Sequence, residues 1–185
     1  MRIIGGALGG RKITPPAKMP FTRPTTDLAK EGLFNIIGNN LDITRLKTLD
    51  LFGGTGCISY ELASRGARDL TIVENDPKMY AFICQEIQIL QLEHCRVLKV
   101  DVFRFIEQCK ETFDFIFAGP PYALENIDEL PGLIFRQGLL NEGGWFVLEH
   151  TDRHRFEKYP FFRTARKYGS TIFSIFVNRE IQEKK

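Results

Sequence analysis

The sequence contains no long apolar run. None of its stretches reaches the roughly 18 consecutive apolar residues that a membrane-spanning helix requires. Glycines interrupt the first residues, MRIIGGALGGRK, too early for the apolar core of a secretory signal. These two absences lead us to expect a cytoplasmic protein that does not associate with a membrane.

Cysteine and histidine are scarce as well. The four cysteines, Cys57, Cys84, Cys95 and Cys109, are widely spaced without a CxxC pair, and only three histidines are present. Zinc sites built from these ligands need closely spaced pairs, so we expect free thiols and no metal. A chain of 185 residues is long enough for one domain with a substantial core, and we expect a monomer.

Basic and acidic side chains nearly balance, with a net charge of +2, but their distribution is uneven. Residues 1–26 carry five basic side chains and no acidic one, and residues 151–170 carry six basic and two acidic ones. Residues 27–150 carry eleven basic and nineteen acidic side chains. Two basic flanks around an acidic centre suit a polyanion such as nucleic acid, although they equally suit a solvated surface.

From residue 46 onward, short apolar segments alternate with amphipathic ones. Five segments have the composition of buried strands: LKTLDLF, DLTIVEND, CRVLKVD, FDFIFAGPPY and GGWFVLEH. The segments between them are predicted helices, the last of which is the proline-interrupted ENIDELPGLIFRQGLL. This alternation predicts a mostly parallel α/β sheet, whose ligands bind at the carboxyl ends of the strands.

The flanking segments differ from this pattern. Residues 1–24 are rich in glycine and proline, and their pieces RII and RKI predict a hairpin extension that precedes a main domain over residues 25–185. Residues 161–178 alternate on either side of Gly169, which predicts a terminal hairpin.

A helix is predicted at the start of the main domain, over residues 25–38. Thr25, Thr26 or Asp27 can cap its first turn, and Gly38 with Asn39 can end it. Its expected buried face comprises Leu28, Leu33, Phe34 and Ile37.

The first predicted strand ends in a glycine-rich turn that follows an acidic residue. Asp50 and Phe52 precede Gly53, Gly54 and Gly56, and glycines at a strand-to-helix turn let a ligand approach the backbone. The GxGxxG fingerprint of dinucleotide sites is not met, and a carboxylate at this place would repel a pyrophosphate. A nucleoside with a cationic sulfonium and an amino acid fits better, and a nicotinamide dehydrogenase remains a distant alternative.

The next two strands also end in acidic residues. Glu74, with Asn75 beside it, lies near the spacing at which an acid binds a ribose hydroxyl. Asp101, followed by Val102, can accept a hydrogen bond from an adenine amine. A single acid here would usually be a helix cap, but three acids at adjacent strand ends after a glycine turn favour a cofactor site.

The fourth strand ends in Gly119, Pro120, Pro121 and Tyr122. Methyl transfer to an amine of a planar base requires acceptors that turn the amine, an aromatic face that holds the base, and a rigid backbone. Two prolines fix the backbone and leave their carbonyls as expected free acceptors, while the tyrosine supplies the ring. A plain proline-rich loop is the alternative interpretation.

These motifs resemble one known family. Arg2 to Gly6, Gly10 to Lys12, Arg23 to Asp27 and Leu33 to Asn35 look like the N-terminal signature of RsmD-type 16S ribosomal RNA guanine-N2 methyltransferases. The likeness continues, in order, over Asp50 to Gly56, Ser64 to Ala67, Glu74 to Asp76, Pro120 to Tyr122, and Tyr168 with Gly169. It therefore covers nearly the whole chain.

The resemblance implies a class I, Rossmann-like methyltransferase fold, with a mostly parallel seven-stranded sheet, a C-terminal antiparallel hairpin and an N-terminal hairpin. It implies S-adenosylmethionine as the methyl donor. It also implies a guanine amine of small-subunit ribosomal RNA, naked or in an assembling 30S particle, as the acceptor. By position, Asp50, Phe52, Gly53, Gly54 and Gly56 would surround the methionine part, Glu74 and Asn75 the ribose, and Asp101 and Val102 the adenine. Arg2, Arg11, Lys12 and Arg23 would contact RNA phosphates.

The chain departs from the family at Gly119, where the family has Asp and related amine methyltransferases have Asn. Glycine offers no side-chain acceptor. The protein is then a weakened enzyme, an enzyme in which another residue supplies the acceptor, or an RNA-binding assembly protein that retains the cofactor. Glu125 and Asp128 are acidic residues a short way downstream. A methyltransferase for DNA or another amine is a further alternative, because the Pro-Pro-Tyr motif is shared.

Overall fold

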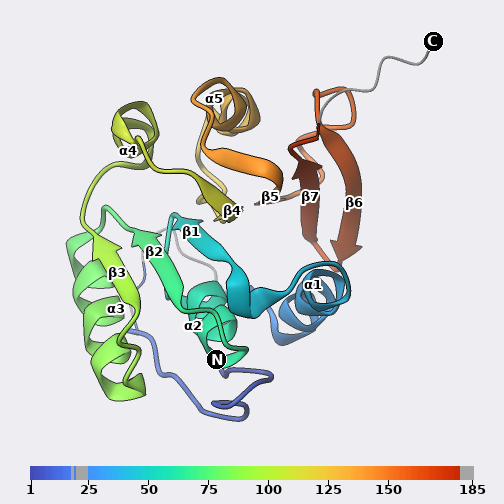
Figure 1. Ribbon diagram of the computed structural model, residues 1–185. Coiled ribbons are helices and arrows are strands. Elements are labelled where there is room, and N and C mark those ends of the chain that lie inside the picture. The colour runs from blue at the N-terminus through green and yellow to red at the C-terminus, as the bar shows by residue number, and fades with distance from the viewer. Residues whose placement is uncertain (18, 20–24, 180–185) are drawn as a thin grey trace.

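A seven-stranded sheet forms the centre of the protein (Figure 1). The computed structural model describes residues 1–17, 19 and 25–179. Its strands lie in the order β3-β2-β1-β4-β5-β7-β6. The five parallel members are β1 (Lys47–Leu51), β2 (Asp69–Val73), β3 (Cys95–Leu98), β4 (Phe113–Ala118) and β5 (Leu140–His150). The order reverses between β1 and β4, which is the switch point where open α/β sheets bind ligands.

Helices cover both faces of this sheet (Figure 1). One face packs against α1 (Asp27–Asn40) and α2 (Cys57–Ser64), in a core that includes Phe34, Leu62 and Phe115. The other face packs against α4 (Val102–Gln108) and α5 (Leu130–Arg136), through residues such as Ile106 and Ile134. The remaining helix, α3 (Pro77–Leu90), packs beside β3 and α2 and begins with the proline that its sequence predicted.

The C-terminal strands confirm the predicted hairpin. Strand β6 (Phe162–Tyr168) pairs antiparallel with β7 (Thr171–Val177), which in turn pairs antiparallel with β5. Gly169 has a φ of 63° at the turn, a left-handed conformation that glycine adopts without strain. The mostly parallel sheet with an antiparallel end is the fold that the sequence predicted.

The N-terminal segment pairs with itself as expected, but over a shorter stretch. A single antiparallel bridge joins Arg2 and Lys12, and hydrogen bonds run from Ile3 N to Arg11 O and from Ile13 N to Met1 O. The glycines between these residues break the pairing, so no strand is formed among residues 1–17. Ile3 and Ile13 are nevertheless buried against Tyr60 and α3.

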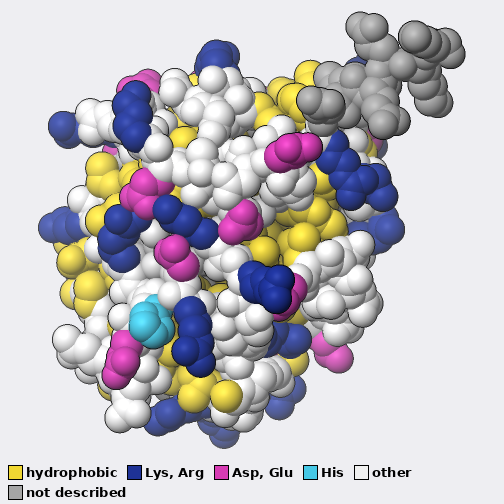
Figure 2. Space-filling model, in the orientation of Figure 1, with side chains coloured by type: hydrophobic (Ala, Val, Ile, Leu, Met, Phe, Trp, Pro, Cys, Tyr) yellow, Lys and Arg dark blue, Asp and Glu magenta, His cyan; other side chains and the backbone are white. Residues whose placement is uncertain are grey.

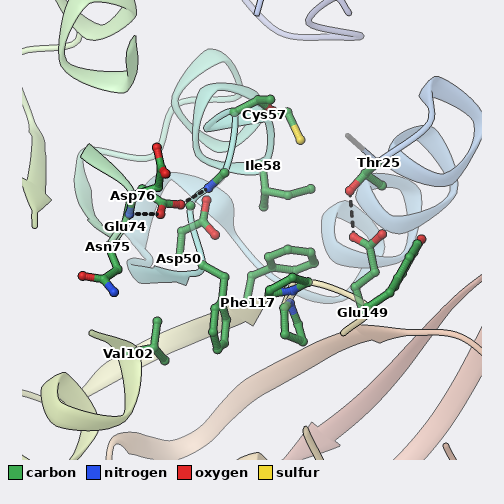
Figure 3. Close-up of a pocket in the computed structure, with 18 of the residues that line it drawn as sticks. Thr25, Asp50, Cys57, Ile58, Glu74, Asn75, Asp76, Val102, Phe117 and Glu149 are labelled. Carbon is green, nitrogen blue, oxygen red and sulfur yellow. Dashed lines mark hydrogen bonds between the residues drawn. The ribbon is translucent and has the colours of Figure 1, made fainter. Parts of the chain in front are cut away.

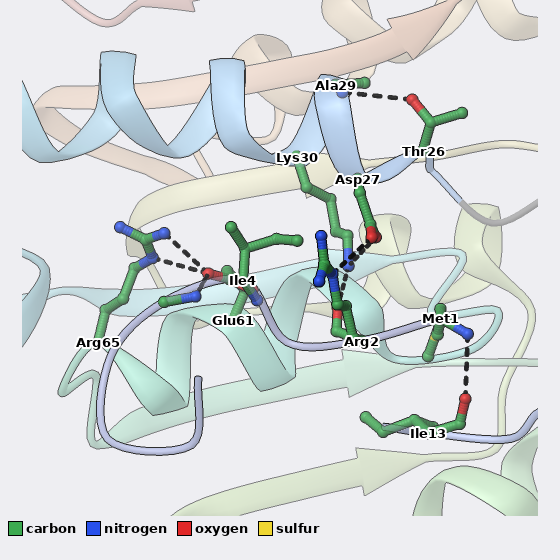
Figure 4. A network of polar contacts seen from close by, with 11 residues as sticks. Met1, Arg2, Ile4, Ile13, Thr26, Asp27, Ala29, Lys30, Glu61 and Arg65 are labelled. Carbon is green, nitrogen blue, oxygen red and sulfur yellow. Dashed lines mark hydrogen bonds and ion pairs between the residues drawn. The ribbon is translucent and has the colours of Figure 1, made fainter. Parts of the chain in front are cut away.

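Glu61 of α2 anchors this segment (Figure 4). Its fully buried carboxylate accepts hydrogen bonds from the backbone N–H groups of Ile4, at 2.7 Å, and Gly5, at 2.9 Å. Arg65, one turn further along α2, donates two hydrogen bonds to the same carboxylate, at 2.9 and 2.8 Å. Ser64 completes the anchor, because its backbone oxygen accepts from Ala7 N and its hydroxyl from Leu8 N.

Two details of the predicted helices are wrong. Leu28, expected on the buried face of α1, is 65% exposed, and the buried positions are instead Ala29, Lys30, Leu33, Phe34 and Ile37. Lys30 is buried because its ammonium donates to the Arg2 carbonyl and pairs with Asp27. The helix also passes the expected stop at Gly38 and ends at Asn40. Its cap, Thr26, was one of the three predicted, since its hydroxyl accepts from Ala29 N.

The helix predicted over ENIDELPGLIFRQGLL is shorter than expected. A 3-10 turn at Ile127–Glu129 leads into α5, which ends at Arg136. Strand β5 begins at Leu140, three residues before the predicted start of that strand. Among the described residues, no helix is both long enough and apolar enough to cross a membrane.

Candidate functional site

A pocket of about 480 Å³ opens at the carboxyl edge of the sheet (Figure 3). It lies where β1, β2, β4 and β5 end, so residues distant in sequence meet there. Nearly all residues predicted to bind cofactor or act in catalysis line it: Asp50, Phe52, Gly53, Gly54, Glu74, Asn75, Asp101, Val102, Gly119, Pro120, Pro121 and Tyr122. The exception is Gly56, the last glycine of the turn, which does not line the pocket.

The glycine turn is held tightly between β1 and α2. Gly53 N donates to Val73 O at 2.9 Å, and Gly56 N donates to Gly53 O at 2.7 Å. Gly54 and Gly56 have φ values of 54° and 76°, in the region that favours glycine. Gly56 also forms the N-terminal boundary of α2 without a side-chain cap. The turn therefore presents backbone, rather than side chains, to the pocket.

Glu74 secures this turn from the neighbouring strand. One carboxylate oxygen accepts from Gly54 N at 2.7 Å, and the other accepts from Asp76 N, also at 2.7 Å (Figure 3). Each carboxylate oxygen has a second lone pair, so both can still accept a hydroxyl from a ligand. Glu74 thus links the glycine turn to the end of β2 and lines the pocket at the same time.

Two further acids of the pocket, Asp76 and Asp101, act as helix caps. Asp76 accepts from the backbone of Lys78 and Met79 at the start of α3, both at 2.9 Å. Asp101 accepts from Arg104 N at 3.0 Å at the start of α4. Both also line the pocket, so capping fixes the direction of a carboxylate that remains available to a ligand.

Asp50 is a buried carboxyl at the base of the pocket. It is 3% exposed, and Ser59 of α2 donates a hydrogen bond to it at 2.7 Å. The pKa of Asp50 is raised from 3.8 to about 7, mainly by burial and in part by the negative charges of Glu74 and Glu149, while the hydrogen bond from Ser59 lowers it. The protein thus holds a carboxyl that gains its charge near neutral pH.

The Pro-Pro-Tyr segment forms the opposite wall. Gly119 N donates to Leu51 O at 3.2 Å, which ties the end of β4 to β1. The Pro121 carbonyl accepts from Leu124 N at 2.9 Å, so it is not the free acceptor that the sequence suggested. The Pro120 carbonyl receives no backbone hydrogen bond from the described residues. The Tyr122 side chain is exposed at the pocket, where its ring is accessible to a planar ligand.

Glu149 is a pocket residue that sequence reasoning missed. It lies near the end of β5, is 7% exposed, and accepts a hydrogen bond from Thr25 Oγ1 at 2.7 Å (Figure 3). The rule used for the first four strands, that ligands meet strand ends, would have found it in GGWFVLEH. The two acidic residues downstream of the motif, Glu125 and Asp128, do not line the pocket, and Asp128 pairs with His154.

Three of the predicted RNA-contacting residues, Arg2, Arg11 and Lys12, do not line the pocket. Arg11 and Lys12 are exposed, and Arg2 pairs with Asp27 at 2.9 Å while its side chain stays 61% exposed. Arg23 lies outside the described residues. On the face shown in Figure 2, Lys and Arg side chains lie among Asp and Glu side chains rather than in one continuous patch.

The cysteines and histidines do not form a metal site in the described part of the chain, where no three His, Cys, Asp or Glu side chains are suitably grouped. All four cysteines are free thiols. Cys57 lines the pocket at the start of α2, and burial raises the pKa of its thiol to about 11, so the thiol stays protonated at neutral pH.

Solved structures share this architecture. That of the Escherichia coli protein yhhF has a TM-score of 0.85 and 25% identity, over 97% of this chain and 98% of that one. That of an RNA methyltransferase from Salinibacter ruber, in complex with S-adenosyl-L-homocysteine, has a TM-score of 0.66 and 16% identity, over 88% of this chain and 98% of that one. The fold is that of the Rossmann-like methyltransferases.

Sequence comparisons narrow this class to a family. The profile described as Conserved hypothetical protein 95 matches residues 1–177. YlbH of Bacillus subtilis (strain 168), named as a candidate rRNA methyltransferase, is 37% identical over 154 residues, or 81% of this chain and 82% of YlbH. Ribosomal RNA small subunit methyltransferase D of Escherichia coli (strain K12) is 31% identical over 149 residues, or 80% of this chain and 71% of that protein. The chain belongs to this family, the RsmD-type methyltransferases.

Proposed function

We propose that the protein transfers a methyl group from S-adenosylmethionine to the N2 amine of a guanine in small-subunit ribosomal RNA. The observation that carries this proposal is the meeting of two motifs in one pocket. The glycine turn with Asp50, Glu74 and Asp101 forms one wall, and the Pro120-Pro121-Tyr122 segment forms the other. A nucleoside methyl donor and a planar amine acceptor can therefore face each other across it.

The residues fit the parts of S-adenosylmethionine, which supplies an electrophilic methyl group on a cationic sulfur. Asp50 and the turn at Gly53 and Gly54 would hold the methionine part, because a buried carboxyl suits its cationic groups and glycines let the ligand approach the backbone closely. Phe52 lies beside them, and Gly56 keeps the turn in place. Glu74, with Asn75, would accept the ribose hydroxyls through its second lone pairs. Asp101 and Val102 would hold the adenine.

The exposed basic side chains of the N-terminal segment support the ribosomal substrate. Arg2, Arg11 and Lys12 expose basic groups that can meet phosphates, and Arg23 completes the predicted set. Arg2 would exchange Asp27 for a phosphate when RNA binds. Such contacts release counterions, so affinity for RNA would fall steeply with added salt. This substrate implies a cytoplasmic protein, which we expect to act as a monomer.

The test is methyl transfer by the full chain. Purified protein is incubated with methyl-labelled S-adenosylmethionine and either naked 16S RNA or 30S particles from cells that lack the endogenous enzyme. We expect label in the RNA, recovered as N2-methylguanine after nuclease digestion and chromatography. Label in adenine, or no label despite cofactor binding by calorimetry, would overturn the proposal.

A second candidate function follows from Gly119 alone. Without the acidic side chain of the family motif, the protein could retain cofactor and RNA without transferring the methyl group. This assembly-protein hypothesis predicts normal binding of both ligands and no labelled product, and it predicts that Gly119→Asp creates activity.

The ionisation of Asp50 leads to a pH-dependent affinity. Only the charged carboxylate balances a cationic cofactor, and its pKa is about 7. We therefore expect S-adenosylmethionine to bind about tenfold more weakly at pH 6 than at pH 8, as measured by calorimetry. The folding stability of the cofactor-free protein depends on pH in the opposite direction. A raised carboxyl pKa contributes stability below about pH 4, and this contribution is lost as the pH rises through 7.

Asp50→Asn provides the control for this prediction. The amide cannot ionise, so cofactor affinity should be weak and nearly constant between pH 6 and pH 8. If the affinity of the parent protein for S-adenosylmethionine is equally constant between pH 6 and pH 8, Asp50 does not change its charge in this range.

A further inference from the structure

We propose that the Glu149 carboxylate grips the amine of the target base in place of the side chain that position 119 lacks. This inference rests on the proposed methyl transfer and deepens it. It concerns how a chain with glycine in the catalytic motif still positions its substrate.

The sheet places Glu149 next to Gly119. Ala118 of β4 pairs in register with Leu148 of β5, so the following residues on each strand, Gly119 and Glu149, also lie side by side. A Cβ atom added to Gly119 would lie 3.8 Å from Glu149 Oε2. A carboxylate on residue 119 would extend from that Cβ into the same region. An acceptor oxygen from β5 thus lies here close to the place where the family has one from β4.

The Glu149 carboxylate is also oriented. Thr25, which is 8% exposed, donates to Oε2 at 2.7 Å and holds the group at the pocket wall. A carboxylate oxygen has two lone pairs, so Oε2 can accept a second hydrogen bond while it keeps that from Thr25. Pre-oriented acceptors of this kind are what a transfer reaction requires, because little reorganisation is left for the transition state.

Gly119 and Glu149 are compatible with each other, whereas an aspartate at position 119 would compete with Glu149. Two carboxylates in contact raise each other's pKa and resist ionising together. An added Cβ would also lie 3.0 Å from a carbon of the Phe117 ring, a contact that requires a small shift. Glycine at position 119 therefore leaves one carboxyl group at this place rather than two.

The guanine edge matches a carboxylate. Its N1–H and N2–H groups are adjacent donors, so the two oxygens of Glu149 can accept one hydrogen bond from each. Adenine presents an acceptor at N1 beside its N6 amine, which a carboxylate would repel. Glu149 thereby favours guanine over adenine, and Tyr122 holds the plane of the base.

The transfer balances with these groups. The amine nitrogen uses its lone pair to bond the methyl carbon, and the carbon–sulfur bond breaks with its electrons moving to sulfur. The nitrogen then carries one proton too many. This proton passes to the Glu149 carboxylate and from there to water, which restores the carboxylate for the next turnover.

Single-turnover rates of methyl transfer test the role of Glu149. We expect Glu149→Gln and Glu149→Ala to lower the rate about 10²-fold with the affinity for S-adenosylmethionine nearly unchanged. Glu125→Gln, which changes an exposed carboxylate outside the pocket, is the matched control and should keep the parent rate. Adding Gly119→Asp to Glu149→Ala should raise the single-turnover rate at least tenfold. The same substitution in the parent chain should not raise the rate.

The outcomes separate this inference from the proposed function. Parent activity together with unchanged rates in both Glu149 variants would overturn the role of Glu149 alone. A complete lack of transfer by the parent chain would overturn both. Should the Glu149 variants fail to fold, as judged by thermal melting, Gly119→Asp in the parent chain decides: a tenfold gain in rate would overturn the inference.

Discussion

Replacing Glu61 with glutamine should lower the free energy of unfolding by about 3–5 kcal/mol, the range for breaking a buried ion pair. The Glu61 side chain is fully buried and accepts from two backbone N–H groups and from Arg65. An amide has one oxygen and one NH₂ group. Whichever way it is turned, the NH₂ group faces a donor, and the Arg65 charge loses its counterion.

The loss of stability in Glu61→Gln should also loosen the N-terminal segment. Because Ile4 and Gly5 are bound by this carboxylate, their amide protons should exchange faster with solvent in Glu61→Gln, along with those of Ile3 and Ile13. Urea unfolding gives the free energy, and hydrogen exchange gives the location.

Glu111→Gln is the control for this substitution. Glu111 also binds two basic residues, Lys47 and Arg96, both at 2.8 Å, but its side chain is 42% exposed. Surface ion pairs contribute at most about 1 kcal/mol, so this variant should unfold almost as the parent does. Equal stabilities of Glu61→Gln and Glu111→Gln would show that the buried Glu61 contacts stabilise the protein no more than a surface ion pair does.

Replacing Gly56 with alanine should both destabilise the protein, by about 3 kcal/mol, and weaken S-adenosylmethionine binding more than tenfold. Gly56 has a φ of 76°, which strains any other residue. An alanine Cβ would also lie 2.4 Å from atoms of the Tyr60 ring. That ring is fully buried among Ile3, Ile13 and α3 and cannot move aside, so the glycine turn must shift instead.

Gly132→Ala is the matched glycine control. Gly132 is exposed within α5, and an added Cβ would have no heavy-atom neighbour within 4 Å. Alanine is the better helix former, so this variant should be up to about 1 kcal/mol more stable and bind cofactor as the parent does. Calorimetric affinities and urea midpoints measured for both variants test the pair; unchanged binding by Gly56→Ala would refute the role assigned to the turn.

The parts of the structure that follow local rules were predictable. Alternation of strands and helices indicated the parallel sheet, and Thr26, Pro77 and Gly169 indicated where elements begin or turn. The strand-end rule brought Asp50, Glu74 and Asp101 into one pocket because all parallel strands end at the same edge. These inferences need only short segments and one general property of sheets.

The parts that depend on distant contacts were not predictable. Leu28 was expected in the core because helical spacing cannot show where the partner surface stops. The Glu61 anchor joins residues 57 positions apart, and the hydrogen bond from Thr25 to Glu149 joins residues 124 apart. Neither pair carries a motif in the sequence. The register of β4 against β5, which places Glu149 beside Gly119, likewise appears only in the assembled sheet.

Helix α2 connects the glycine turn of the pocket to the N-terminal segment. Its first residue follows the glycine turn, and its last turn holds the N-terminal segment through Glu61 and Ser64. One further residue inserted within α2 would rotate one end against the other by about 100° and lengthen it by about 1.5 Å. Either the turn or the anchor would then point the wrong way. The length of this helix therefore matters more to the protein than its surface composition, and we expect an insertion in the loops around α2 to disrupt the structure less than one within it.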